Sequence, residues 1–262
     1  MKVSRRGSYL SKGTLKMKIC ALISSHSPSF FTEMTVKTFI RETKGHDLNI
    51  HVGFHSNLKD YTKDFSMFEK LRGLCQFHAV DEIDWMKHNE DIYRYSKMHC
   101  KNLENLLKNI RYYDFDYVLI LDNDLYFKKD FVSEILTRYS NFDMIGSHFD
   151  DREENVTVID NYGNPIIFSP KISVWNMMIS RKLYDFILQD TSVIYPQIVD
   201  GVFYDSFAYV EKIATNFSKK IVPTGEMGQL VEHFFGSSFN YGIIMNKNNH
   251  ERPQKIYESE FA

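Results

Sequence analysis

The sequence predicts an α/β fold, with a mainly parallel central sheet flanked by helices and a smaller subregion beside it. Two runs, residues 19–23 and 117–121, are apolar at every position, which is typical of strands covered on both faces. Segments with helical periodicity separate the expected strands, and such alternation forms parallel sheets through right-handed crossovers. The chain has 262 residues, 43% of them hydrophobic, which is enough for one sizeable domain of this class.

The first half of the chain follows a β-α-β-α-β order, which is typical of a Rossmann-like unit. A polar loop over residues 24–29 closes the first strand. Leu103, Leu106 and Leu107 share one helical face, which must pack on the sheet. In chain order we expect strands over 19–23, 48–54, 75–80 and 117–121, and helices over 34–40, 61–71 and 95–110.

The second half of the chain predicts further strands and helices with more irregular chain between them. Asp200 is expected to open a late helix, because an acidic side chain suits the positive end of the helix dipole. The polar chain around 150–164 is expected to be irregular, and such chain often carries substrate contacts. The expected elements are helices over 131–139, 181–188 and 200–214, and strands over 143–146 and 173–179.

Asp122-Asn123-Asp124 follows directly after the apolar run 117–121. Ligands bind outside the carboxyl ends of strands in open parallel sheets, so these carboxylates lie where a ligand is expected. Neighbouring carboxylates repel each other and lose hydration, which a divalent cation would offset. The same residues also suit an Asx-rich turn without a ligand. The motif alone leaves both interpretations open.

The charge balance limits the possible partners. Lys and Arg total 32 against 34 for Asp and Glu, a net charge of -2, so no global field attracts polyanions. A nucleic-acid partner would need a local patch, and the best candidate is the amino-terminal tail. The basic residues of this tail are Lys2, Arg5, Arg6, Lys12, Lys16 and Lys18.

The cysteines and the hydropathy pattern predict a cytoplasmic protein, in the host cytoplasm if the source is viral. Cys20, Cys75 and Cys100 are widely spaced without a C-x-x-C pair, so we expect reduced thiols in the core. No apolar run approaches about 18 residues, and no secretory signal precedes the first strand.

With the Asp122–Asp124 motif, three further features resemble the GT-A class of nucleotide-sugar glycosyltransferases, of bacterial and viral type. These features are His99 and Asn102 on the helix before the motif, Asp200-Gly201 at the late helix, and His233 followed by Gly236 and Ser238. The likeness extends from Lys18 to about Tyr241. It implies a single domain over 18–262, with a nucleotide-sugar half (18–127) and an acceptor and metal-completing half (128–262). The residues before it, 1–17, are the expected flexible basic tail.

The resemblance implies a divalent metal, Mn²⁺ or Mg²⁺, and a nucleotide-sugar donor, most often a UDP-sugar. Asp124 would bind the metal directly, and Asp122 would contact the ribose or bind the metal through water. Asn123 would lie against the nucleotide. His233 would be a third ligand, and a mixed carboxylate and imidazole set suits Mn²⁺. Without the resemblance, His233 would be a histidine packed in an aromatic cluster.

The expected nucleotide contacts lie at strand ends and on one helix. Two leave the first strand at its carboxyl end. Two follow the second strand, where they either bind the base and ribose or cap the next helix. Two more, one helical turn apart, either hydrogen-bond to the nucleotide or tie their helix to nearby loops. Ser24 and His26 follow the first strand, Ser56 and Asn57 follow the second, and His99 and Asn102 lie on the helix.

An inverting transferase needs a general base for the acceptor hydroxyl. Asp200 is the first candidate and Asp205 the second, whereas a retaining enzyme needs no such base. Trp175 and Asn176 are candidates for the acceptor wall, because aromatic faces stack on sugars and bases. The acceptor is open between a glycan, a lipid-linked sugar, a protein side chain and a modified DNA base.

Three other functions are compatible with parts of the pattern. A haloacid-dehalogenase-like phosphatase also has strand-Asp-X-Asp, but normally on its first strand. A sugar-nucleotide pyrophosphorylase is closer in fold but would have a glycine-rich, basic phosphate loop, and residues 24–31 contain neither Gly nor Lys. A non-enzymatic nucleotide-binding module is the fourth and weakest interpretation.

Overall fold

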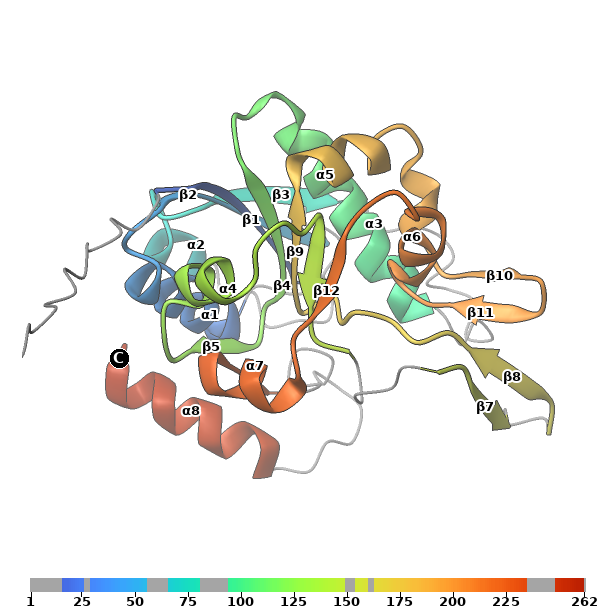
Figure 1. Ribbon diagram of the computed structural model, residues 1–262. Coiled ribbons are helices and arrows are strands. Elements are labelled where there is room, and N and C mark those ends of the chain that lie inside the picture. The colour runs from blue at the N-terminus through green and yellow to red at the C-terminus, as the bar shows by residue number, and fades with distance from the viewer. Residues whose placement is uncertain are drawn as a thin grey trace, which may run out of the picture.

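The computed structural model describes residues 16–25, 29–55, 66–80, 94–148, 154–159, 163–234 and 248–261. Its centre is a seven-stranded sheet in the order β12-β6-β9-β4-β1-β2-β3 (Figure 1). Strand β9 runs antiparallel to β4 and β6, and the other neighbouring pairs are parallel. The strands are β1 (Lys18–Ser24), β2 (Asp47–His55), β3 (Gln76–Val80), β4 (Tyr117–Asp122), β6 (Met144–Gly146), β9 (Asn176–Ser180) and β12 (Lys219–Ile221).

Helices cover both faces of this sheet, so the predicted α/β class and its mainly parallel sheet are confirmed (Figure 1). Alternate residues of β1 enter two separate cores, because successive strand side chains point to opposite faces. One core contains residues of α1 (Phe30–Glu42), α2 (Ser66–Lys70), α4 (Phe131–Arg138) and α7 (Thr224–Leu230). The other contains residues of α3 (Arg94–Asn109), α5 (Arg181–Ile187) and α6 (Ala208–Ile213), with the 3-10 helices η2 (Ile110–Tyr112) and η4 (Thr191–Ile194).

The predicted leucine face of α3 is buried as expected. Leu103, Leu106 and Leu107 have no exposed surface and share a core with Cys20 and Cys100. Cys75 is half-buried, and all three cysteines are free thiols. Burial raises the pKa of each thiol to about 12, which keeps the reactive thiolate scarce at neutral pH.

A second sheet, in the order β10-β11-β8-β7, projects from the main one (Figure 1). Its strands are β7 (Val156–Ile159), β8 (Pro165–Phe168), β10 (Gln197–Val199) and β11 (Val202–Tyr204). Strand β7 lies inside the segment predicted to be irregular, so that prediction is wrong for these four residues. A third, two-stranded sheet joins β5 (Leu125–Phe127) to β13 (Val231–His233), and α8 (Asn248–Glu260) ends the described chain near α1.

The helix predicted over 200–214 is wrong in its first half. Asp200 and Gly201 have φ angles of 52° and 77° and form the turn between β10 and β11, in which Val199 pairs with Val202. Asp-Gly is a strong signal for a two-residue hairpin turn, because both of its residues tolerate positive φ. The helix begins only at Ala208.

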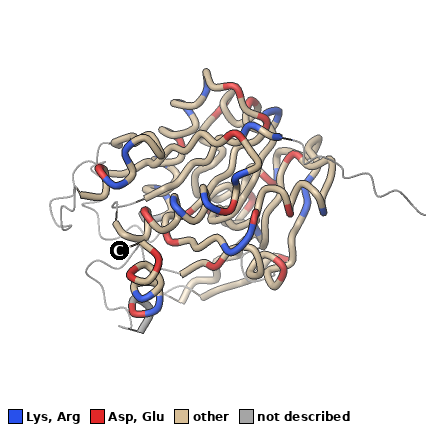
Figure 2. Tube along the Cα trace, turned by 90° about the vertical axis from the view of Figure 1, so that its left-hand side faces the viewer, with Lys and Arg blue, Asp and Glu red and all other residues tan. Residues whose placement is uncertain are grey.

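Charges of both signs are mixed along the described chain (Figure 2). Two lysines of the predicted basic tail form ion pairs, Lys16 with Asp47 at 2.6 Å and Lys18 with Asp114. The other four basic residues of that tail lie outside the described residues. No helix among the described residues is both long and apolar enough to cross a membrane.

Candidate metal centre

The Asp122 motif lies at the carboxyl edge of the main sheet. Strand β4 pairs with β1 in parallel, and the last paired residues are Ser24 and Asp122. Strands β2 and β3 continue from β1 on its other side, so the sheet order reverses between β1 and β4. Open α/β sheets bind ligands at such a reversal, outside the strand ends.

Three threonines of α1 hold the chain that contains Asp124. The Thr35 hydroxyl accepts from the Leu125 amide at 2.9 Å and donates to the Leu125 carbonyl at 3.0 Å. Asn123 donates to Thr32 at 3.3 Å, and the Phe127 amide donates to Thr38 at 3.2 Å. All three threonines are fully buried. The sequence analysis missed them, although their i, i+3, i+6 spacing is a detectable signal for one helical face.

Strand β13 brings His233 to the same place from the far end of the chain. It pairs with β5 in antiparallel register, with His233 opposite Leu125. The pairing extends by one bond, in which the Phe234 amide donates to the Asp124 carbonyl at 3.0 Å. This short sheet therefore makes His233 a neighbour of Asp124.

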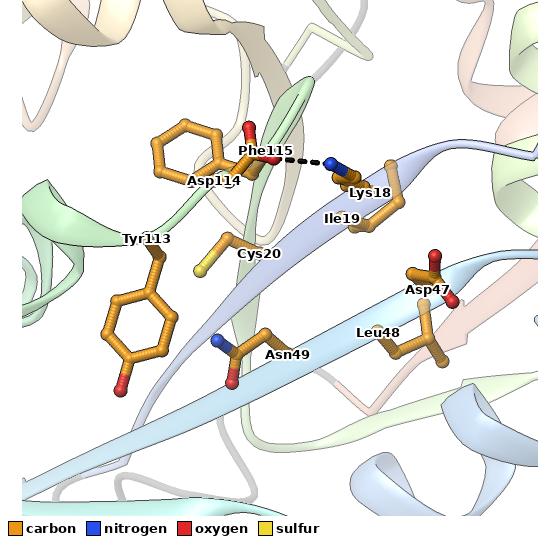
Figure 3. Close-up of a pocket in the computed structure, with 9 residues that line it drawn as sticks. All are labelled: Lys18, Ile19, Cys20, Asp47, Leu48, Asn49, Tyr113, Asp114 and Phe115. Atoms are coloured by element: carbon orange, nitrogen blue, oxygen red, sulfur yellow. Dashed lines mark hydrogen bonds and ion pairs between the residues drawn. The ribbon is translucent and has the colours of Figure 1, made fainter.

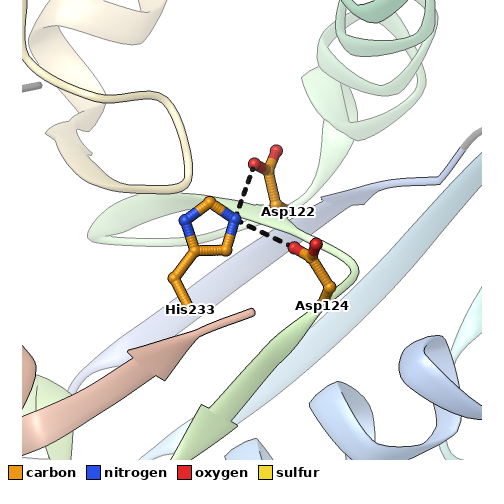
Figure 4. Close-up of side chains that lie close together, drawn as sticks. All are labelled: Asp122, Asp124 and His233. Atoms are coloured by element: carbon orange, nitrogen blue, oxygen red, sulfur yellow. Dashed lines mark ion pairs between the residues drawn. The ribbon is translucent and has the colours of Figure 1, made fainter. Parts of the chain in front are cut away.

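The imidazole of His233 points its Nε2 at both carboxylates (Figure 4). Its Nε2 is 3.0 Å from Asp124 Oδ1 and 3.5 Å from Asp122 Oδ2. One ligand atom from each of the three residues lies within 4.8 Å of the others. Asp124 is 1% exposed, whereas the Asp122 side chain is 26% exposed, so Asp122 faces solvent and Asp124 faces the interior.

The two carboxylates of this cluster are only partly neutralised by His233. Apart from the ion pair with His233, neither carboxylate oxygen of Asp124 has a hydrogen-bond donor among the described residues. Burial lowers the pKa of His233, but the two carboxylates raise it more, to about 9. His233 is therefore a cation at neutral pH. One positive charge between two carboxylates leaves a net negative site, which favours a divalent cation.

A second polar cluster adjoins Asp122. His99 Nδ1 lies 3.9 Å from Asp122 Oδ1, and burial lowers the pKa of His99 although Asp122 raises it. Lys171 and Asp205 also act electrostatically on His99, and they form an ion pair at 2.5 Å. Burial raises the pKa of Asp205, but the effect of Lys171 and Ser206 is opposite and larger, so the pKa is lowered to about 2. Lys171 was absent from the sequence predictions.

Some predicted nucleotide residues brace the strand ends. Asn102 is 1% exposed and donates to Ser24 Oγ at 3.2 Å and to the Gly53 carbonyl at 2.9 Å, so it ties α3 to β1 and β2. A Cβ on Gly53 would lie 1.9 Å from Asn102 Oδ1, which explains the glycine. Asn123 is also buried and donates to Ser25 Oγ at 2.9 Å. The predicted contacts His26, Ser56 and Asn57 lie outside the described residues.

The predicted acceptor and base residues have unequal positions. Trp175 is 6% exposed and stacks on His233, and Asn176 is 1% exposed and hydrogen-bonds to Ser147 Oγ at 3.3 Å. Neither presents an open wall. The Asp200 side chain is 85% exposed at the hairpin turn, so the helix-opening reason for choosing it is wrong. Asp205, the second choice, is partly buried, with 27% of its side chain exposed, and it acts electrostatically on His99.

A cavity of about 280 Å³ lies at the opposite edge of the sheet (Figure 3). Residues at the start of β1 and β2, including Lys18 and Asp47, line it with the segment before β4. The parallel strands begin there and end at Asp122, so this cavity is separate from the candidate metal centre.

No protein-family model and no curated protein sequence matches the chain. Among solved structures, the galactosyltransferase LgtC in complex with donor and acceptor sugar analogues has a TM-score of 0.50 and 13% identity, covering 94% of this chain and 97% of that one. This likeness shows the fold. The chain has the GT-A arrangement, a mainly parallel sheet flanked by helices.

Two further solved structures are similar at TM-scores of 0.48. The mannosyltransferase PcManGT from Pyrobaculum calidifontis, in complex with GDP-Man and Mn²⁺, is 12% identical, and the match covers 80% of this chain and 56% of that one. The 4-diphosphocytidyl-2C-methyl-D-erythritol synthase from Anaerococcus prevotii is 14% identical, and the match covers 79% of this chain and 89% of that one.

Proposed function

We propose that this protein is a metal-dependent glycosyltransferase that moves a sugar from a nucleotide-sugar donor to an acceptor hydroxyl. One observation carries the proposal: Asp122, Asp124 and His233 come together at the carboxyl edge of the sheet, at the β1–β4 reversal. In the reaction, the bond from the anomeric carbon to the diphosphate oxygen breaks and the acceptor oxygen bonds to that carbon. The hydroxyl proton is released.

The three residues fit a divalent cation. Asp124 is a buried carboxylate whose charge is offset, within the described part of the chain, by His233 alone, and burying such a charge without a partner is costly. Two carboxylates and an imidazole suit Mn²⁺ better than the all-oxygen set that Mg²⁺ prefers. When bound, the cation would neutralise the charge of the leaving nucleoside diphosphate. Asp124 and His233 would hold it directly, and the more exposed Asp122 would face the donor.

The residues beside Asp122 would contact the transferred sugar. Asp205 is ionised at neutral pH because Lys171 holds it, and a carboxylate with a pKa of about 2 is a weak base. We therefore propose that Asp205 accepts a hydrogen bond from a substrate hydroxyl. His99, with its Nε2 buried and without a hydrogen-bond partner among the described residues, would donate to or accept from the donor.

Donor hydrolysis tests this function without knowledge of the acceptor. The purified protein is incubated with UDP-sugars and GDP-sugars with Mn²⁺, with Mg²⁺ or with excess chelator, and nucleoside diphosphate release is measured. We expect metal-dependent release from one donor class, UDP-sugars first because the resembling family uses them most often. Pyrophosphate release from nucleoside triphosphates instead would identify a nucleotidyltransferase. Release that is unchanged by chelator would refute the metal-dependent mechanism.

A further inference from the structure

The side chain that stacks on His233 is Trp175, which directly precedes β9 of the main sheet. The rings of Trp175 and His233 are stacked, with centroids 4.7 Å apart and an angle of 26° between their planes. The β4–β9 register ends with Leu121 opposite Asn176, so Trp175 lies level with Asp122 at the end of β4. The indole is thus placed by the residue that leads into β9, beside the end of the strand that carries the motif.

His233 needs such a support because its own strand is short. Strand β13 has three residues, and its one partner among the described strands is β5, which also has three. The torsion that turns an imidazole about its Cβ–Cγ bond is broad, so the backbone does not fix which edge of the ring faces Asp124. A stacked indole restricts the plane of the ring, and offset-stacked aromatic pairs are favourable in themselves.

We propose that Trp175 is a positioning residue of the metal centre. Its indole face holds the imidazole of His233 so that Nε2 points at Asp122 and Asp124, and this role rests on the proposed function. The indole is 6% exposed and one face is covered by His233, so that face is not available to an acceptor sugar. Residues that orient metal ligands typically alter metal affinity by about 10- to 100-fold when replaced.

The chain contains two tryptophans, which allows a direct test. In Trp85→Phe, Trp175 is the single indole, and paramagnetic Mn²⁺ held by His233 would lie close enough to quench its fluorescence. We expect saturable quenching that chelator reverses, and competition by Mg²⁺ without quenching. Mn²⁺ binding detected by calorimetry without any change in Trp175 fluorescence would overturn the proposal, and this arm needs no substitution at Trp175.

The second arm compares substitutions in the full-length protein with Mn²⁺ alone as the probe. Trp175→Leu removes the aromatic face and should weaken Mn²⁺ binding by about 10-fold, whereas Trp175→Phe keeps a face and should restore most of it. Circular dichroism and the melting temperature report whether each variant folds. A packing role alone would lower the melting temperature without changing Mn²⁺ affinity, and that result in folded Trp175→Leu would overturn the proposal.

The two proposals fail differently. If the wild-type protein does not bind Mn²⁺, the metal centre is wrong, and the role of Trp175 is overturned with it. If the wild-type protein binds Mn²⁺ and folded Trp175→Leu binds it equally well, only the role of Trp175 is overturned.

Discussion

Binding of Mn²⁺ to the site is predicted to release a proton from His233. A metal-bound imidazole must be neutral, whereas His233 between two carboxylates has a pKa of about 9. At pH 7 a group with a pKa of about 9 is about 99% protonated, so binding should release about one proton per Mn²⁺. The same competition weakens apparent affinity about 100-fold at pH 7 and only about 2-fold at pH 9.

The assay is calorimetry of Mn²⁺ binding in pairs of buffers that differ in ionisation enthalpy, at pH 7, 8 and 9. The slope of observed enthalpy against buffer enthalpy gives the protons released. We expect a slope close to one proton at pH 7 and about half a proton at pH 9. His233→Asn is the matched control and should release none. Tight binding at pH 7 with no proton release would refute the protonated His233 or its role as a ligand.

The metal-free protein should lose stability at alkaline pH, and the remaining expectations concern single positions. The pKa of His233 in the folded protein is raised above its unfolded value of 6.5, so its stabilising contribution is complete below pH 6.5 and is lost as the pH rises through about 9. Urea unfolding should show a lower unfolding free energy at pH 10 than at pH 6, and His233→Asn should lack this difference. Thr35→Val removes two hydrogen bonds to Leu125 and should lower the unfolding free energy in urea by about 1–3 kcal/mol. The control Thr157→Val, at an exposed strand position, should change it by less than about 0.5 kcal/mol. Equal effects would contradict the role of Thr35 in holding this segment. Asp205→Asn removes the charged acceptor for a substrate hydroxyl and should lower sugar transfer by about 10- to 100-fold while the nucleotide still binds. Asp200→Asn should transfer near the wild-type rate, and the opposite ranking would favour the hairpin carboxylate as the catalytic one.

The strands and the placement of the motif could be predicted because their signals are local. The runs over residues 19–23 and 117–121 lie within β1 and β4, and Asp122 ends β4. The position of His233 depends on pairing between β5 and β13, which are more than 100 residues apart, so only the resemblance suggested it. Its role as a metal ligand stays a prediction.

Other features were missed because their signals are ambiguous or non-local. Asp200-Gly201 suits both a helix start and a hairpin turn, and only strand pairing decides between them. Helix α8 has a mainly polar sequence and is held by polar contacts such as Tyr257 with Glu33 at 2.5 Å, which no hydrophobic pattern announces. The bracing role of Asn102 was one of two interpretations left open, and its hydrogen bond to Gly53, a residue of a distant strand, could not be read from the local sequence.

The most direct measurement of the central claim is calorimetry of UDP binding, with saturating Mn²⁺ and with excess chelator, in the wild type and in Asp124→Asn. The account predicts that Mn²⁺ tightens UDP binding at least about 10-fold in the wild type, because the cation bridges Asp124 and the diphosphate, and that Asp124→Asn loses this gain while remaining folded. Equal UDP affinity in chelator and in Mn²⁺, or a folded Asp124→Asn that keeps the full gain, would contradict the metal centre.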